Sequence, residues 1–560
     1  GQLWAASHPG KHHQKRLMML KQRMYGLLAC VAFVCGMTSA AFAQNGVIVD
    51  ADGILRTRTV HDPSGALMKQ RLKEAKAALN PDLARPSELR KISLNRLEAA
   101  LAEQIRVGGG PTADMKNLAG LTRIQYVFFY PETGDIVIAG PSEGYFADAT
   151  GRIRGIETGA ATLQLDDLIV ALRAYRPGED GVKTISVSID PTKEGRARIQ
   201  QFLLRIGGRA TPNYTQAIVN GLRESLGEQD VVLRGISPKT HFAQVLAEAD
   251  YRMKLIGIGL EQPPVKITSY VAKANPGAVS RNALQRWYFK PNYECVKVSE
   301  DELAMELVGS GVKLVGADEM VTAEGVRVAS KRVDTASKEF VESFTRLYPE
   351  LAVKSPVYGQ LQNLMDMAIA AAFIQRQDYY GQAGWKMEVF SDEKAYPVET
   401  LNAPEKVATA VNAIWKGRTL MTPIGGGVNI QPRVALNRDR LLPDADGAVK
   451  ETREQIDLKA VAADNWWWDC FQEAGDGSQE SGDRCQAGKG LQSVPRPLTP
   501  DSRPLSFFFP LGVLNHFAQP PAPHQVVKQR DRGQNQQQQN QGAQDGPKRN
   551  KRQPNKDAHE

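Results

Sequence analysis

A repeated tetrapeptide is the first feature of the sequence that could bind a metal ion. Asp-Ala-Asp-Gly occurs at 50–53 and again at 444–447. A calcium loop of the EF-hand type needs oxygen ligands at positions 1, 3, 5 and 12 around a glycine at position 6. The residues at positions 1 and 12 of the two copies carry no acidic side chain: Ile48, Thr59, Leu442 and Arg453. We therefore predict a tight hairpin turn at 50–53 and a loop at 444–447.

Histidine is scarce in the part of the chain with a globular composition. Between residues 44 and 468 the sequence contains only His61 and His241, so a Ser-His-Asp triad would have to use one of them. No HExxH motif is present, and the glycine-rich stretch at 309–316 lacks both phosphate-binding spacings. Because His241 falls in the first turn of a predicted helix, we expect it to cap that helix or lie on the surface. We expect no metal site and no cofactor.

Asp190 is the strongest single candidate for a catalytic acid or base. It follows a predicted strand at 182–189, and active sites of α/β proteins tend to lie at strand ends. Paired with a second acid, it could hydrolyse a polymer by general acid and base catalysis. Asp followed by Pro191 is also typical of a helix start, with Asp as the N-cap. The same pattern recurs at three further places: Thr211-Pro212, Ser237-Pro238 and Ser355-Pro356. We therefore predict an N-cap at Asp190 and assign no catalytic residue.

The most highly charged predicted helix covers 241–260. Its apolar residues recur at helical spacing and predict one buried face. Glu248 precedes Arg252 by four residues, and Asp250 precedes Lys254 by four, which is the favourable order for ion pairs along a helix. We predict that these pairs lie on a solvated face, with a functional role for one of the acids as the alternative.

Strand and helix patterns alternate along the chain without a repeat. We predict hairpins at 46–58 and 124–140 and short strands between 265 and 329. Further helices are predicted over these ranges: 65–79, 88–105, 163–175, 333–348, 357–375 and 403–415. The mixed order predicts the α+β class. The order strand, helix, helix, strand, helix over 182–258 leaves open the alternative that this segment is one small α/β unit.

Changes of composition and pattern divide the chain into six regions. These are a leader with a signal peptide (1–43), an N-terminal α+β region (44–180), a strand-helix-helix-strand-helix unit (181–264), a mixed region that is strand-rich and then helical (265–468), an irregular extension (469–525), and a basic Gln/Asn-rich tail (526–560). The tail contains too few apolar residues to offset its chain entropy, so we predict that it is disordered.

The first 43 residues predict export. Five basic residues precede the apolar run at 25–43, which ends in Ala-Phe-Ala. Residues 1–43 contain no acidic residue. This pattern is typical of a secretory signal peptide, and we predict cleavage before Gln44. The run is short and rich in small residues, which argues against the alternative of an N-terminal transmembrane helix. We therefore expect a periplasmic or extracellular protein with no transmembrane anchor after cleavage.

Charge argues against a nucleic-acid partner. The chain has a formal net charge of +8, but residues 1–43 carry five bases, and 526–560 carry eight bases and four acids. Residues 44–525 therefore keep a net charge of about −1, and no basic face for nucleic acid is indicated.

Cysteines and tryptophans mark the end of the predicted folded region. Three cysteines follow the leader, and Cys470 and Cys485 are close enough in sequence to pair, which leaves Cys295 single. The run at 466–468 is Trp-Trp-Trp. It could form an aromatic platform for a sugar or peptide, but we favour closure of the core with one exposed neighbour.

Several segments together resemble an uncharacterised family of exported bacterial proteins found mainly in planctomycetes. They are "ISVSIDPTKEG" (185–195), "HFAQVLAEADYRMKLIGIGLE" (241–261) and the stretches at 286–314 and 348–374. The resemblance covers roughly 150–430. It implies export, and it implies no catalytic residues because the family has no assigned activity.

These patterns lead to one expectation and one alternative. We expect an exported cell-envelope or extracellular protein that acts by binding or assembly, with an envelope protein or polymer as its partner. Nothing in the sequence indicates an oligomeric state. The alternative is a carboxylate-dependent hydrolase of an envelope polymer, with Asp190 as its first suspect.

Overall fold

The computed structural model describes much of residues 44–487. The undescribed positions within this span are 61, 63, 207–211, 276–282, 322–326, 330–333, 413, 417–418, 422–426, 456–457 and 472–483. The predicted leader, most of the extension, the tail and His61 lie outside the described residues. The described elements are helices and mixed sheets, so the predicted α+β class is confirmed. No helix among them has both the length and the apolar character needed to cross a bilayer.

The larger sheet has nine described strands. In spatial order they are β1 (Gln44–Val49), β2 (Ile54–Val60), β15 (Lys406–Val407), β9 (Gln229–Arg234), β8 (Ile185–Pro191), β18 (Gly427–Ile430), β10 (Ala283–Pro291), β13 (Val312–Val321) and β14 (Arg327–Ala329). β15 is parallel to β2, and β18 is parallel to β10, while the other neighbours are antiparallel. The strands come from all three regions between 44 and 468, so these regions share one sheet.

The second sheet has eight described strands. In spatial order they are β19 (Leu442–Pro443), β11 (Val296–Val298), β12 (Ala304–Leu307), β4 (Tyr126–Tyr130), β5 (Asp135–Ser142), β3 (Ser87–Ser93), β20 (Trp467–Phe471) and β21 (Arg484–Ala487). The predicted hairpin at 124–140 is β4 and β5. Two smaller hairpins pair β6 (Tyr145–Ala147) with β7 (Ile153–Gly155) and β16 (Ile414–Lys416) with β17 (Thr419–Met421). In the β20–β21 register Cys470 lies opposite Cys485.

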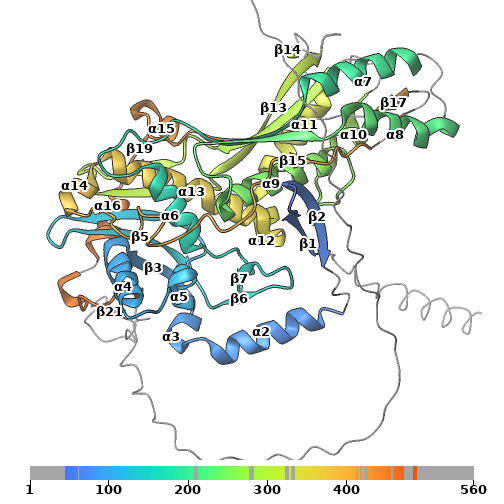
Figure 1. Cartoon of the computed structure of the whole chain (residues 1–560). Helices are drawn as coiled ribbons and strands as arrows, with labels where there is room; N and C mark the ends of the chain where they lie inside the picture. The colour runs from blue at the N-terminus through green and yellow to red at the C-terminus, as the bar shows by residue number, and fades with distance from the viewer. Residues whose placement is uncertain are drawn as a thin grey trace, which may run out of the picture. The chain divides into compact units, whose positions relative to one another are not determined.

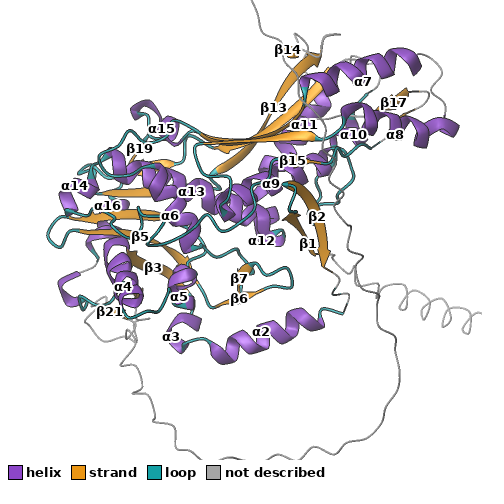
Figure 2. Ribbon diagram, in the orientation of Figure 1, coloured by secondary structure: helices purple, strands orange, loops and turns teal. Residues whose placement is uncertain are grey.

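Helices pack against the sheets (Figures 1 and 2). The described ones are α2 (Ala66–Ala78), α3 (Pro81–Ala84), α4 (Leu94–Arg106), α5 (Ala113–Lys116), α6 (Leu165–Ala174), α7 (Lys193–Ile206), α8 (Thr215–Leu226), α9 (His241–Gly257), α10 (Tyr270–Lys273), α11 (Thr335–Arg346), α12 (Tyr348–Lys354), α13 (Pro356–Arg376), α14 (Tyr379–Ala383), α15 (Pro432–Ala435) and α16 (Ala448–Glu454). α13 is buried along most of its length and contacts both α6 and α9. The predicted core helix at 357–375 is thus confirmed.

The two Asp-Ala-Asp-Gly segments are turns at element boundaries. In the first, the Asp50 carboxylate accepts hydrogen bonds from the backbone N–H groups of Asp52 and Ile54, and Gly53 adopts a φ of 74°. This turn joins β1 to β2, as predicted. In the second, the Asp444 carboxylate accepts from the N–H groups of Val449 and Lys450 in the first turn of α16. The second copy is therefore a loop that leads into a helix.

Three predicted elements were wrong. The segment at 88–105 begins as strand β3, and its helix α4 starts only at Leu94. The predicted helix at 403–415 contains the short strand β15 and the start of β16. The first of the short strands predicted between 265 and 329, at 265–271, is mostly loop, and α10 begins at Tyr270. At β3 and β15, pairing with distant strands outweighed the local pattern, because side-chain burial decides between marginal propensities.

The prediction of a solvated charged face on α9 was also wrong. Glu248, Asp250, Arg252 and Lys254 are all buried, although the helix covers the predicted residues. α9 packs on β8 and β18 of the larger sheet and also contacts α6 and α13. A helix covered on several sides must bury charges unless it is apolar all round. Here the buried charges are paired, which is the condition for burying them.

All three tryptophans at 466–468 are buried, so neither an aromatic platform nor an exposed neighbour is present. Trp468 packs against Phe128 and Tyr130 in a small apolar cluster on one side of the second sheet. On the other side, the guanidinium of Arg90 lies 4.7 Å from the ring centre of Trp467. Burial on both faces explains why no tryptophan of the run is left for a ligand.

Candidate functional site

Asp190 does not cap a helix. It lies inside strand β8, and helix α7 starts at Lys193, where Thr192 accepts a hydrogen bond from the N–H of Gly195. The Asp190 carboxylate pairs with Arg286 of β10 at 3.1 Å. The N-cap prediction for Asp190 was therefore wrong. Ser237 does not cap α9 either, because Thr240 accepts from the N–H of Ala243.

Asp190 lies in a cluster of charges between the larger sheet and α9, in which Asp250 and Lys254 are buried and Asp190 and Arg286 are partly buried. The ammonium group of Lys254 donates to the carboxylate of Asp250 at 2.9 Å and to the carbonyl of Ile189 at 2.5 Å. Burial raises the pKa of Asp250 to about 6, although Lys254 lowers it in part. Asp190 does not line the pocket described next, so the structure offers no observation that favours a hydrolase built on it.

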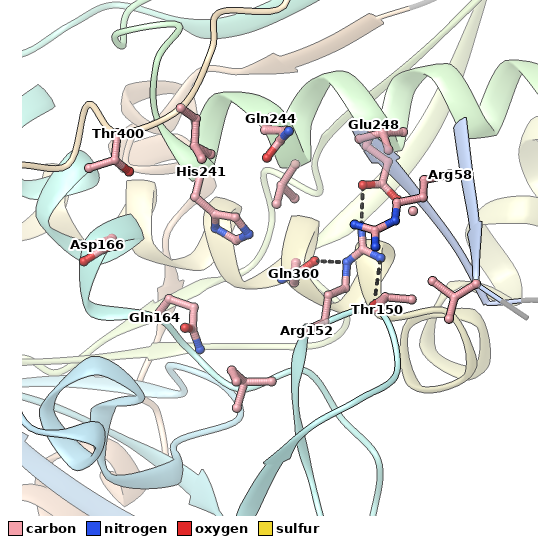
Figure 3. Close-up of a pocket in the computed structure, with 17 residues that line it drawn as sticks. Arg58, Thr150, Arg152, Gln164, Asp166, His241, Gln244, Glu248, Gln360 and Thr400 are labelled. Atoms are coloured by element: carbon pink, nitrogen blue, oxygen red, sulfur yellow. Dashed lines mark hydrogen bonds and ion pairs between the residues drawn. The ribbon is translucent and has the colours of Figure 1, made fainter. Parts of the chain in front are cut away.

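A polar pocket of about 390 Å³ lies beside the N-terminal half of α9. It collects residues that are far apart in the sequence (Figure 3). The walls come from β1 and β2, the segment before β7, the start of α6, α9, α13 and residues 400–401. Its labelled polar side chains are Arg58, Thr150, Arg152, Gln164, Asp166, His241, Gln244, Glu248, Gln360 and Thr400. Amide, hydroxyl and charged groups thus face one cavity.

His241 and Asp167 form a hydrogen-bonded pair at the edge of this pocket. The Nδ1 atom of His241 lies 3.0 and 2.8 Å from the two carboxylate oxygens of Asp167. Because a carboxylate only accepts, Nδ1 carries the proton and Nε2 is the acceptor in the neutral ring. The imidazole points into the pocket (Figure 3). Burial opposes the charged form of His241, but the carboxylates of Asp167 and Asp166 together outweigh it and raise the histidine pKa.

A chain of buried charges holds the opposite wall. Arg152 donates from Nε to Gln360 at 3.0 Å and from Nη2 to the carboxylate of Glu248. Arg252, one turn further along α9, donates to the same carboxylate at 3.3 Å and to Glu261 at 2.7 Å. Buried ion pairs of this kind need several hydrogen bonds to offset desolvation, and this network supplies them. Arg152 and Glu248 are therefore positioned rigidly at the pocket wall.

Some polar groups of the pocket have no partner among the described residues. The side chains of Arg58, Gln244 and Thr400 make no hydrogen bond or ion pair to any described residue. Asp166 accepts a hydrogen bond from the Tyr396 hydroxyl at 2.8 Å, and burial raises the pKa of its carboxyl group. Polar groups left open at a concave surface are available to water or to a ligand.

The sequence indicated these residues only in part. His241 was placed at the start of a helix, as found, but its role at the pocket was missed, and Asp166, Asp167 and Arg152 were not considered. Two adjacent acids in the first turn of a predicted helix were a usable signal. Their meaning depended on a partner 74 positions away, at His241, which no local pattern reveals.

The Asp167–His241 pair predicts a measurable titration. In the Asp167→Asn variant, the imidazole of His241 loses its charged partner while its burial remains. We expect the pKa of His241 to lie above its ordinary value in the unmodified protein. In the Asp167→Asn variant we expect this pKa to be lower than in the unmodified protein. Nuclear magnetic resonance of the ring protons against pH measures both values. Equal pKa values in the two proteins would contradict the assigned pairing.

Comparison with known proteins gives one match. The sequence profile of a family described as a protein of unknown function (DUF1598) matches residues 187–270. No curated protein and no solved structure matches the chain. The matched segment includes most of β8, all of α7, α8, β9 and α9, and the first residue of α10. Helix α9 of this matched segment contributes His241, Gln244 and Glu248 to the pocket.

Proposed function

We propose that the chain is an exported periplasmic or extracellular protein that binds a small polar fragment of an envelope polymer in this pocket. The observation that supports the proposal is the set of open polar groups in the cavity. Arg58, Gln244 and Thr400 face it without a partner among the described residues. Binding sites of this kind use a few open polar groups to orient a ligand. The apparent signal peptide at 1–43 supports the export part of the proposal.

The charges of the pocket favour a ligand that is rich in hydroxyl groups and nearly neutral. Arg152 is compensated by Glu248, and protonated His241 is compensated by Asp167. Arg58 and Asp166 add one further charge of each sign. A strongly anionic or cationic ligand would therefore find no matching excess charge. Glutamine amides and threonine hydroxyls can both donate and accept, which suits the hydroxyl groups of a sugar.

Titration calorimetry with soluble, uncharged disaccharide fragments tests the proposal. The Gln244→Ala variant removes an open amide from the wall, and we expect its affinity to fall about tenfold, in the range of one lost hydrogen bond to a polar ligand. Gln216→Ala is the matched control, because Gln216 lies on helix α8 and is exposed. Binding that is absent, or equally strong in both variants, would overturn the assignment of the ligand to this pocket.

Export is tested separately by N-terminal sequencing of the protein recovered from the cell envelope or the medium. We expect a mature N-terminus at Gln44. A protein that stays inside the cell with residues 1–43 intact would refute the export part of the proposal and leave the binding part to be judged by calorimetry.

A further inference from the structure

We infer that the pocket is also a hydrolytic site, in which His241 is the general base that activates water against a carboxylic ester of the bound ligand. The inference rests on the proposed function, because the ester must first be held in the pocket. It is carried by the geometry of the Asp167–His241 pair and by the open polar groups around it.

The pair has the arrangement that a histidine base needs. Asp167 contacts Nδ1 through both oxygens, and only 5% of its side chain is exposed, so the carboxylate has little room to turn away. Asp167 lies in the first turn of α6, and His241 is the first residue of α9. Because two packed helices hold the partners, the ring orientation is fixed. A carboxylate on Nδ1 fixes the tautomer and stabilises the imidazolium that forms during proton transfer.

The other ring nitrogen is available to a reactant. Nε2 makes no hydrogen bond to a described residue, and the ring faces the cavity (Figure 3). The side chain of His241 is 34% exposed, so water can reach it. A general base must lie within hydrogen-bond reach of the proton that it takes, and a water molecule in the pocket can meet this condition.

The proposed step balances without a further reactant. Water transfers a proton to Nε2 of His241 as its oxygen bonds to the ester carbonyl carbon, which gives a tetrahedral oxyanion. The oxyanion then collapses, the bond from carbon to the alcohol oxygen breaks, and the departing oxygen takes the proton back from Nε2. The products are a carboxylic acid and an alcohol, and the histidine returns to its neutral form.

The surrounding groups favour an ester over a glycosidic bond. Hydrolysis of a glycoside needs two carboxyl groups that are free to act on the two sides of the bond. Glu248 is held by two arginines, and Asp166 accepts from Tyr396, so each carboxylate already has a partner. An ester instead needs one base and a donor for the oxyanion. Gln244, one turn after His241, and Arg58 of β2 offer N–H donors with no described partner.

The reaction requires neutral His241, so its rate should rise with pH as the imidazole loses its proton. Asp167 and Asp166 from α6 face the ring and favour its charged form, while Arg152 opposes it. Arg58 from β2 and Glu248 from α9 also line the cavity. The two acids of α6 outweigh burial and Arg152 and raise the histidine pKa. The midpoint of the rate profile should therefore lie above the ordinary pKa of histidine, and it should move down when Asp167 loses its charge.

Hydrolysis of 4-nitrophenyl acetate and of an O-acetylated N-acetylglucosamine disaccharide tests the inference on the mature protein. For His241→Gln we expect kcat/KM to fall about 100-fold, the lower end of the range for losing a general base. For Asp167→Asn we expect a smaller fall together with a shift of the pH midpoint to lower pH. Gln216→Ala should behave like the unmodified protein. Circular dichroism melting of each variant shows whether the fold is intact.

The outcomes separate this inference from the proposed function. Ester hydrolysis that is lost with His241 supports the inference. If the disaccharide binds in calorimetry but its ester is not cleaved, or if His241→Gln cleaves it as fast, the inference is wrong and the binding proposal stands. If the ester is cleaved in a His241-dependent way but no ester-free fragment binds, the binding proposal is wrong. If neither binding nor hydrolysis occurs, both are wrong.

Discussion

Replacing Asp469 with alanine is expected to lower the free energy of unfolding by about 3–5 kcal/mol, the usual effect of leaving a buried charge without its partner. Arg90 is fully buried on strand β3 and donates to the two oxygens of Asp469 on β20 at 2.9 and 2.7 Å. Its guanidinium also donates to the carbonyl of Ala119 at 2.5 Å and stacks on Trp467. In the variant these contacts would hold a cation in the core with no anion beside it.

Chemical denaturation followed by tryptophan fluorescence measures this effect, because Trp467 and Trp468 directly precede Asp469. Glu103→Ala is the matched control, since Glu103 pairs with Arg106 on an exposed surface and its loss should leave the unfolding midpoint nearly unchanged. Arg90→Lys should also destabilise the protein, because an ammonium group cannot make the two-pronged contact of a guanidinium. A loss in Asp469→Ala no larger than that in Glu103→Ala would show that the pair does not hold β3 to β20.

Replacing Lys254 with methionine is expected to have the second large effect, a loss of about 3–5 kcal/mol at pH 8 and a smaller loss at pH 5. Asp250 is fully buried, and the ammonium group of Lys254 lies 2.9 Å from its carboxylate. Burial already raises the pKa of Asp250 to about 6 against the attraction of Lys254. Without that attraction the pKa should rise further. At pH 5 the folded variant then holds a neutral Asp250, which costs less to bury than a charged one.

The sign of the pH dependence follows from proton binding. An acid whose pKa is higher in the folded state than its ordinary 3.8 binds more protons when folded. The contribution of Asp250 to the free energy of unfolding is therefore fully present below about pH 3.8. This contribution is lost as the pH rises through about 6. In Lys254→Met this loss should continue to higher pH, so the difference from the unmodified protein grows between pH 5 and pH 8.

Denaturation of both proteins at pH 5 and pH 8 measures this growth. Lys354→Met is the control, because Lys354 pairs with Glu350 on an exposed part of α12 and should show no comparable pH dependence. A loss that is equal at the two pH values would mean that Asp250 does not change its protonation in response to Lys254.

Local sequence patterns correctly predicted those helices and strands in which the spacing of apolar residues matches the face that the fold buries. The hairpins at 46–58 and 124–140 and the helices α6, α9, α11 and α13 were predicted at nearly the observed residues. β3 shows where this agreement fails. Its charged and apolar residues read as part of a helix, yet Arg90 and Lys91 are both fully buried. Arg90 is stabilised there by Asp469, a partner 379 positions away.

The candidate site shows the same division. The sequence by itself determined that α9 begins at His241 and that its acids and bases follow one another at four-residue spacing. Only the tertiary structure decided that these charges are buried, that Asp190 pairs with Arg286 rather than capping a helix, and that Asp167 and Arg152 meet α9 at a pocket. The physical reason is that helix formation depends on neighbours within a few residues. Burial and the pairing of charges depend instead on which distant segments the fold brings together.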